Sequence, residues 1–117
     1  MARIIKVAAG QLGPIQRAEG RDVAVARMLD LMQQAHAEGC NLIVFPELAL
    51  TTFFPRWYVE DHNEVDRWFE AQMPNAEVQP LFDAAKRYAM GFYLGYAEQI
   101  NEGGRMHRYN TDRKSVV

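Results

Sequence analysis

One carboxylate, Glu47, stands where α/β proteins commonly keep their reactive groups. The residues before it, 42–45, are four consecutive apolar side chains, a pattern typical of a strand buried on both faces. Pro46 has no N–H to give to a sheet ladder, so the strand is expected to end there. Glu47 is then predicted at the carboxyl end of a core strand, where open sheets place ligands and catalytic groups.

The position of Glu47 alone leaves two interpretations open. In one, Glu47 is a structural carboxylate that caps the next turn or pairs with Arg56. In the other, it is a general base in a half-dry pocket, because burial raises the pKa of a carboxyl group and lets it accept a proton near neutral pH. The aromatic residues after it belong either to a core or interface or to the wall of a pocket beside Glu47; they are Phe53, Phe54, Trp57 and Tyr58.

The other candidates for chemistry are weaker. Cys40 lies seven residues before Glu47, at the opposite end of the same strand. At about 3.3 Å per residue the two side chains stand roughly 20 Å apart, which forbids proton transfer and makes Cys40 a buried small hydrophobe. His36, His62 and His107 are scattered and show no helical metal-ligand spacing, so no metal site is expected.

The elements around Glu47 are predicted from periodicity and turn residues. Residues 21–37 carry apolar side chains at helical spacing, and Gly39 can end that helix. The turn at residues 101–104 predicts a hairpin. Strands are expected at 4–10, 42–45, 92–100 and 105–111, and helices at 21–37, after Asn63, and from about Pro80. A right-handed crossover makes the first two strands parallel, so the fold class is α/β with a mixed sheet.

The composition is that of an ordinary soluble domain. The chain has 117 residues, 49% of them apolar, and a net charge of -2, which gives no indication of disorder, nucleic-acid binding or a membrane surface. No apolar run approaches the roughly 20 residues that span a bilayer, and the first residues lack a secretory signal. A single cysteine allows no internal disulfide, so we expect a cytoplasmic protein.

Four short motifs resemble one enzyme superfamily. They are Val-Ala-Ala-Gly-Gln at 7–11, Phe-Pro-Glu-Leu at 45–48, Gly-Tyr-Ala-Glu at 95–98 and Tyr-Asn-Thr at 109–111. Together they resemble the N-terminal part of the nitrilase (carbon–nitrogen hydrolase) superfamily. The run 46–57 resembles, more narrowly, the N-carbamoyl-D-amino acid amidohydrolases, and the likeness extends from about Ile5 to Thr111.

The resemblance implies a fold and a mechanism. The fold would be an α-β-β-α sandwich, of which residues 1–117 form a partial domain truncated at its C-terminal end. Glu47 would be the general base of a Glu-Lys-Cys triad that hydrolyses an N-carbamoyl-D-amino acid to the D-amino acid, carbon dioxide and ammonia. No cofactor is implied, the substrate is a small molecule, and the intact enzyme is expected to be a homo-oligomer.

The lysine and the cysteine of that triad are expected to lie beyond the chain. Lys114 follows Thr111 too closely to match the family's lysine, and the segment after Asp112 departs from the expected apolar strand. We therefore expect the isolated chain to be inactive and poorly soluble. Two alternatives stay open: another amidase of the superfamily, such as a β-ureidopropionase-like enzyme, and a non-catalytic fragment or interaction module from a disrupted gene.

Overall fold

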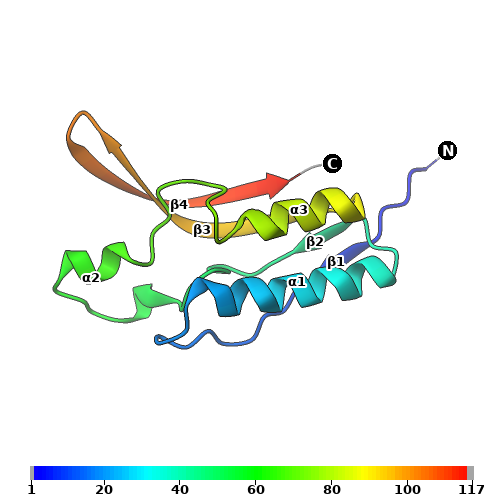
Figure 1. Ribbon diagram of the computed structural model, residues 1–117, viewed down its shortest axis with the longest axis horizontal. Coiled ribbons are helices and arrows are strands. Elements are labelled where there is room, and N and C mark those ends of the chain that lie inside the picture. The colour runs from blue at the N-terminus through cyan, green and yellow to red at the C-terminus, as the bar shows by residue number, and fades with distance from the viewer. Residues whose placement is uncertain (1, 116–117) are drawn as a thin grey trace.

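Four strands form a single mixed sheet in the computed structural model, which describes residues 2–115 (Figure 1). Strand β1 (Val7–Ala9) pairs in parallel with β2 (Leu42–Val44), and β2 pairs in parallel with β3 (Gly91–Glu102). Strand β4 (Arg105–Ser115) returns antiparallel to β3. The predicted α/β class and mixed sheet are confirmed.

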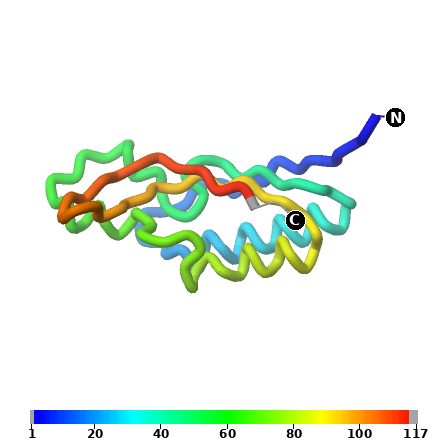
Figure 2. Tube along the Cα trace, turned by 90° about the horizontal axis from the view of Figure 1, so that it is seen from above, coloured from blue at the N-terminus to red at the C-terminus, as the bar shows by residue number. Residues whose placement is uncertain are grey.

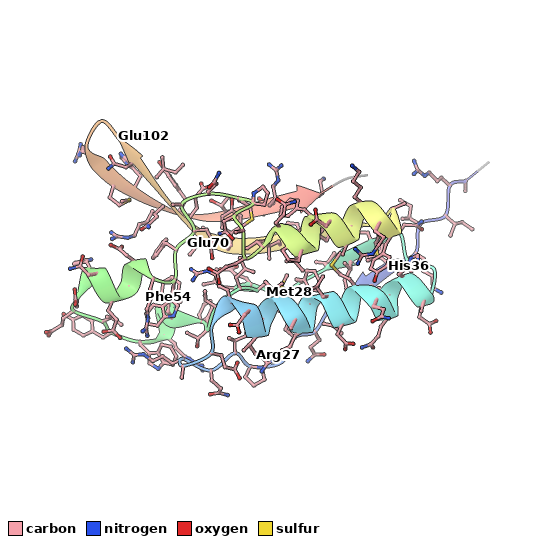
Figure 3. The ribbon with its side chains drawn as sticks, viewed as in Figure 1. Arg27, Met28, His36, Phe54, Glu70 and Glu102 are labelled. Atoms are coloured by element: carbon pink, nitrogen blue, oxygen red, sulfur yellow. The ribbon has the colours of Figure 1, made fainter. Side chains whose placement is uncertain are left out.

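Two long helices lie side by side on one face of the sheet (Figure 2). Helix α1 (Arg21–Ala37) and helix α3 (Gln79–Tyr88) bury their apolar stripes against β2 and β3. Met28 points from α1 into this layer (Figure 3). The fully buried side chains between helices and sheet include those of Met28, Met32, Ile43, Leu81, Phe92 and Leu94. None of the helices within residues 2–115 is long and apolar enough to cross a membrane.

On the opposite face of the sheet, β1 and β2 leave apolar side chains exposed in the described part of the chain. Side chains alternate along a strand, so the residues next to the buried Ile43 and Phe92 point to this second face. Val7 on β1 is 55% exposed and Val44 on β2 is 38% exposed. We call this surface the open face, defined by Val7, Ala9, Val44, Tyr93 and Gly95 on β1–β3 and by the alternate residues Asn110, Asp112 and Lys114 on β4.

Several element boundaries differ from the predicted ones. Strand β1 is confined to Val7–Ala9 because its partner β2 offers only three paired residues. Helix α3 ends at Tyr88, where Ala89 takes a left-handed conformation with φ of 49°, and β3 begins at Gly91, one residue before the predicted start. A short 3-10 turn, η1 (Phe54–Arg56), and helix α2 (His62–Asp66) fill the connection between β2 and α3.

The predicted end of the last strand at Thr111 is wrong. Strand β4 runs on to Ser115, with Arg113 paired to Leu94 and Lys114 paired to Tyr93. Backbone pairing does not require apolar side chains, and long charged residues are typical of an edge strand. The last two residues of the predicted tail, 116–117, lie outside the described residues.

Candidate active site

The segment that carries Glu47 is fastened to β3 on both sides of the carboxylate. The N–H of Phe45 donates to the carbonyl of Tyr93 at 3.1 Å, and the N–H of Ala49 donates to the carbonyl of Gly95 at 3.2 Å. Glu47 therefore follows the end of β2, as the sequence predicts, but its backbone is held by the neighbouring strand. These two hydrogen bonds fix the position of Glu47 along β3.

Glu47 lies over Gly95 on the open face. The side chains on either side of Gly95, Leu94 and Tyr96, are buried on the helix side, so a side chain at position 95 would point to the open face. A Cβ atom at position 95 would stand 3.8 Å from the Cβ of Glu47. Because Gly95 has no side chain, Glu47 can lie directly against the backbone of β3 at this position.

A single amide holds the carboxylate of Glu47. Asn110 lies on β4 in register with Ala97, and its Nδ2 donates to Oε1 of Glu47 at 2.8 Å. Within residues 2–115, Oε2 of Glu47 accepts no hydrogen bond and Glu47 forms no ion pair. The predicted alternative of pairing with Arg56 is not observed, because that guanidinium lies over the ring of Trp57 at 4.8 Å.

The expected burial of Glu47 is wrong for the described chain. Its side chain is exposed, although it borders two hollows of about 220 and 320 Å³. The β2–α3 connection borders Glu47 on the open face through Phe54 and Pro55, but the hollow that they share with it stays open to solvent. Glu47 is therefore beside a hollow, as predicted, but one side of its surroundings is solvent.

Aromatic side chains from the β2–α3 connection line the smaller hollow. Phe54, Phe69, Arg108 and Asn110 are among its lining residues together with Glu47. Phe54 stacks on Trp68, which is buried, with 5.3 Å between ring centroids. Arg108 forms an ion pair with Asp66 of α2, and its guanidinium lies 5.5 Å from the ring centre of Phe69. Of the predicted wall residues, Phe54 thus lines the smaller hollow beside Glu47 and Phe53 the larger one, whereas Tyr58 is exposed.

The comparison with protein families agrees with this arrangement. Residues 6–112 match the family model described as carbon-nitrogen hydrolase. The chain belongs to the carbon–nitrogen hydrolase family. The coarser part of the predicted resemblance is thereby confirmed.

Solved structures show the same fold in larger proteins. A glutamine-dependent NAD(+) synthetase from Cytophaga hutchinsonii superposes with a TM-score of 0.60 at 15% identity, over 96% of this chain and 17% of that one. An N-terminal amidase superposes with a TM-score of 0.64 at 15% identity, over 94% of this chain and 27% of that one. At these identities the likeness concerns the fold alone. This carbon–nitrogen hydrolase chain spans 17% and 27% of the length of these two structures.

Two further acids of this carbon–nitrogen hydrolase chain were not singled out by sequence reasoning. Glu70 is only 4% exposed and forms an ion pair with Arg21 at the start of α1 (Figure 3). Asn75 donates to its second carboxylate oxygen at 2.8 Å. The backbone of Glu70 bridges to β3, since its N–H donates to the carbonyl of Ala97. No local pattern marks a pair that is 49 positions apart in the chain.

Glu98 is the second of these acids and lies on the helix side of β3. It accepts hydrogen bonds from the hydroxyl of Tyr96 at 3.2 Å and from that of Thr111 at 3.3 Å. Burial, and then the nearby Glu98 carboxylate, raise the pKa of Tyr96 to about 12, so this phenol keeps its proton near neutral pH. Asn110 and Thr111 point to opposite faces of β4, and each donates a hydrogen bond to one carboxylate, that of Glu47 and that of Glu98.

The structure keeps the remaining candidates away from Glu47. Cys40 precedes β2 and so lies at the far end of that strand. His36 stacks on Tyr88 between the ends of α1 and α3, with 4.4 Å between centroids. His107 stacks near Tyr109 on β4. Among residues 2–115, no group of three or more acidic, histidine or cysteine side chains could hold a metal ion.

Proposed function

We propose that this chain supplies the general base, Glu47, to an enzyme that hydrolyses N-carbamoyl-D-amino acids. Membership in the carbon–nitrogen hydrolase family supports hydrolysis of a C–N bond in general. The narrower substrate rests on the sequence run 46–57, which resembles the N-carbamoyl-D-amino acid amidohydrolases. The observation that carries the proposal is the carboxylate of Glu47 at the edge of a hollow, with one oxygen held by Asn110 and the other without a hydrogen bond among residues 2–115.

The chemistry follows from the roles that the resemblance implies. Glu47 takes the proton of a cysteine thiol, and the thiolate attacks the ureido carbonyl. One C–N bond then breaks as its nitrogen takes up that proton, and a thioester forms. A water molecule then gives a proton to Glu47 and attacks the thioester, which releases the thiolate and a carbamic acid. The carbamic acid loses carbon dioxide, which breaks the second C–N bond and frees the remaining nitrogen as an amine or ammonia. A lysine stabilises the oxyanion of each tetrahedral intermediate. The cysteine and the lysine would come from a part of the enzyme outside residues 1–117.

A fusion protein tests this proposal. Residues 1–112 of this chain are joined to the remainder of an N-carbamoyl-D-amino acid amidohydrolase, and release of ammonia and D-amino acid is measured. Glu47→Gln should lower kcat by about 100- to 10,000-fold, the usual contribution of a general base. Glu77→Gln, the same change at an exposed glutamate, is the matched control and should leave kcat unchanged. Full activity of the Glu47→Gln fusion would refute the assignment.

Substrate profiling separates the proposal from its alternative within the family. N-carbamoyl-D-amino acids, their L-enantiomers and N-carbamoyl-β-alanine are offered to the same fusion. Preference for the D-compounds supports the proposed activity. Preference for N-carbamoyl-β-alanine supports a β-ureidopropionase-like enzyme, and no hydrolysis of any of them supports a non-catalytic chain.

A further inference from the structure

We propose that Asn110 is a positioning residue that presents Oε2 of Glu47 as the proton acceptor. This inference rests on the proposed function of Glu47. Its evidence is the 2.8 Å hydrogen bond from Nδ2 of Asn110 to Oε1. An ionised carboxylate can only accept hydrogen bonds, so the amide must turn its NH2 group toward Glu47. With Oε1 engaged and Oε2 free within residues 2–115, the two oxygens are no longer equivalent.

The frame behind Asn110 is rigid enough for this role. Strand β4 pairs with β3 along its whole length, and the register sets Asn110 opposite Ala97. The next residue, Thr111, is tied to Glu98 on the other face of the sheet. A shift of β4 along β3 would have to break the side-chain hydrogen bonds on both faces. The amide is therefore held at a fixed position relative to the segment that carries Glu47.

The exposure of Glu47 makes such an orienting contact necessary. An exposed glutamate side chain has several rotamers open to it, so a hydrogen bond is needed to keep its carboxylate in one of them. Gly95 beneath it offers contact but no hydrogen-bond donor from a side chain. Among the described side chains, only Asn110 donates a hydrogen bond to this carboxylate. A charged donor would instead form an ion pair with the base, whereas a neutral amide orients the carboxylate without adding a charge.

Kinetics of the fusion protein test the role. Asn110→Asp keeps the shape but removes the donor, and Asn110→Leu removes all polarity. Both should lower kcat about 10- to 100-fold, as expected for a misplacement of about 1 Å, and should leave KM within about twofold. Asn110→Gln retains an amide donor and should recover part of the loss. Asn101→Leu, the same change at an exposed asparagine near the hairpin turn, is the control and should leave both constants unchanged.

The outcomes separate this inference from the proposed function. Loss of activity in Glu47→Gln together with full kcat in Asn110→Leu overturns the positioning role but leaves the general base in place. Full activity in Glu47→Gln overturns the proposed function itself. A purely structural role of Asn110 would lower the melting temperature of Asn110→Leu, and Asn110→Gln would not restore kcat. Equal melting temperatures with a selective fall in kcat support positioning.

A measurement that needs no activity tests the hydrogen bond directly. The sample is the 117-residue chain with isotope-labelled asparagine and with Val7→Lys, which places a charge on the open face. The side-chain amide protons of Asn110 should shift as the pH is lowered and carboxylates are protonated. Glu47→Gln should abolish this shift, and the amide of Asn101 should not respond in either sample. The inference is contradicted if the amide protons of Asn110 show the same pH-dependent shift with and without Glu47→Gln.

Discussion

The ion pair between Arg21 and Glu70 gives the sharpest prediction for the fold that supports the site. Glu70 is 4% exposed and the side chain of Arg21 is 17% exposed. Arg21 also donates to the carbonyl of Arg67 at 2.6 Å and to that of Phe69 at 3.3 Å. The pair thus ties the start of α1 to the connection whose Phe69 lines the hollow beside Glu47.

Replacing Arg21 with methionine should lower the free energy of unfolding, because it leaves the buried carboxylate of Glu70 without its cationic partner. Asn75 would remain as the side-chain donor to Glu70, at 2.8 Å. Breaking a buried ion pair by removing one partner costs about 3–5 kcal/mol. A domain of this size has a free energy of unfolding of roughly 5–15 kcal/mol, so Arg21→Met should consume a large fraction of it.

The assay is denaturant unfolding followed by the fluorescence of Trp57 and Trp68. The matched control is Arg27→Met on the same helix, whose partner Glu19 is 3.0 Å away in a pair that is partly exposed, at 35% and 26%. Pairs open to solvent contribute about 0–1 kcal/mol, so this control should cost less than Arg21→Met, and the change from arginine to methionine barely alters helix propensity. The comparison of Arg21→Met with Arg27→Met therefore isolates the effect of burial.

A double variant tests whether the unpaired carboxylate of Glu70 causes the loss of stability in Arg21→Met. Arg21→Met combined with Glu70→Leu removes both charges, and buried ion pairs can often be replaced by apolar residues without loss. The double variant should recover most of the stability that Arg21→Met loses. The reasoning is refuted if Arg21→Met costs no more than Arg27→Met, or if the double variant is as unstable as the single one.

Three other predictions concern the core, the pH dependence and the open face. Gly10→Ala should lower the free energy of unfolding by about 1–3 kcal/mol, because a Cβ atom there would lie 2.7 Å from the ring of Phe45; an unchanged denaturation midpoint would contradict this. The raised pKa of Tyr96 means that the native chain keeps a proton between pH 10.0 and about 12 that the unfolded chain loses. This stabilisation should be complete below pH 10.0 and fall as the pH rises toward 12, and a titration of tyrosinate absorbance should show one late-ionising tyrosine that Tyr96→Phe removes. Val7→Lys with Val44→Lys should increase the monomeric fraction in gel filtration, whereas a wild-type chain that already elutes as a monomer with a cooperative melt would show that the open face does not drive association.

Local sequence patterns predicted the helix and the turn that depend only on residues close together in the sequence. Helix α1 occupies residues 21–37 as expected, since apolar side chains at helical spacing need only one buried stripe. The hairpin turn also lies where Gly103 and Gly104 predict it, and both glycines have positive φ angles of 59° and 82°. Helix α2 was misplaced by a few residues because its cap is Asp61, which accepts from the N–H of Asn63. In a short helix, one alternative cap is enough to move the boundary.

The sequence by itself determined that Glu47 follows a core strand and that the chain belongs among α/β proteins, because both depend on neighbours within a few residues. Only the tertiary structure decided what surrounds that carboxylate. Asn110 reaches Glu47 across 63 positions of sequence through the register of β4 on β3, and the exposure of Glu47 depends on which elements cover the open face. Register and coverage are properties of strands packed together, so no local spacing of residues could specify them.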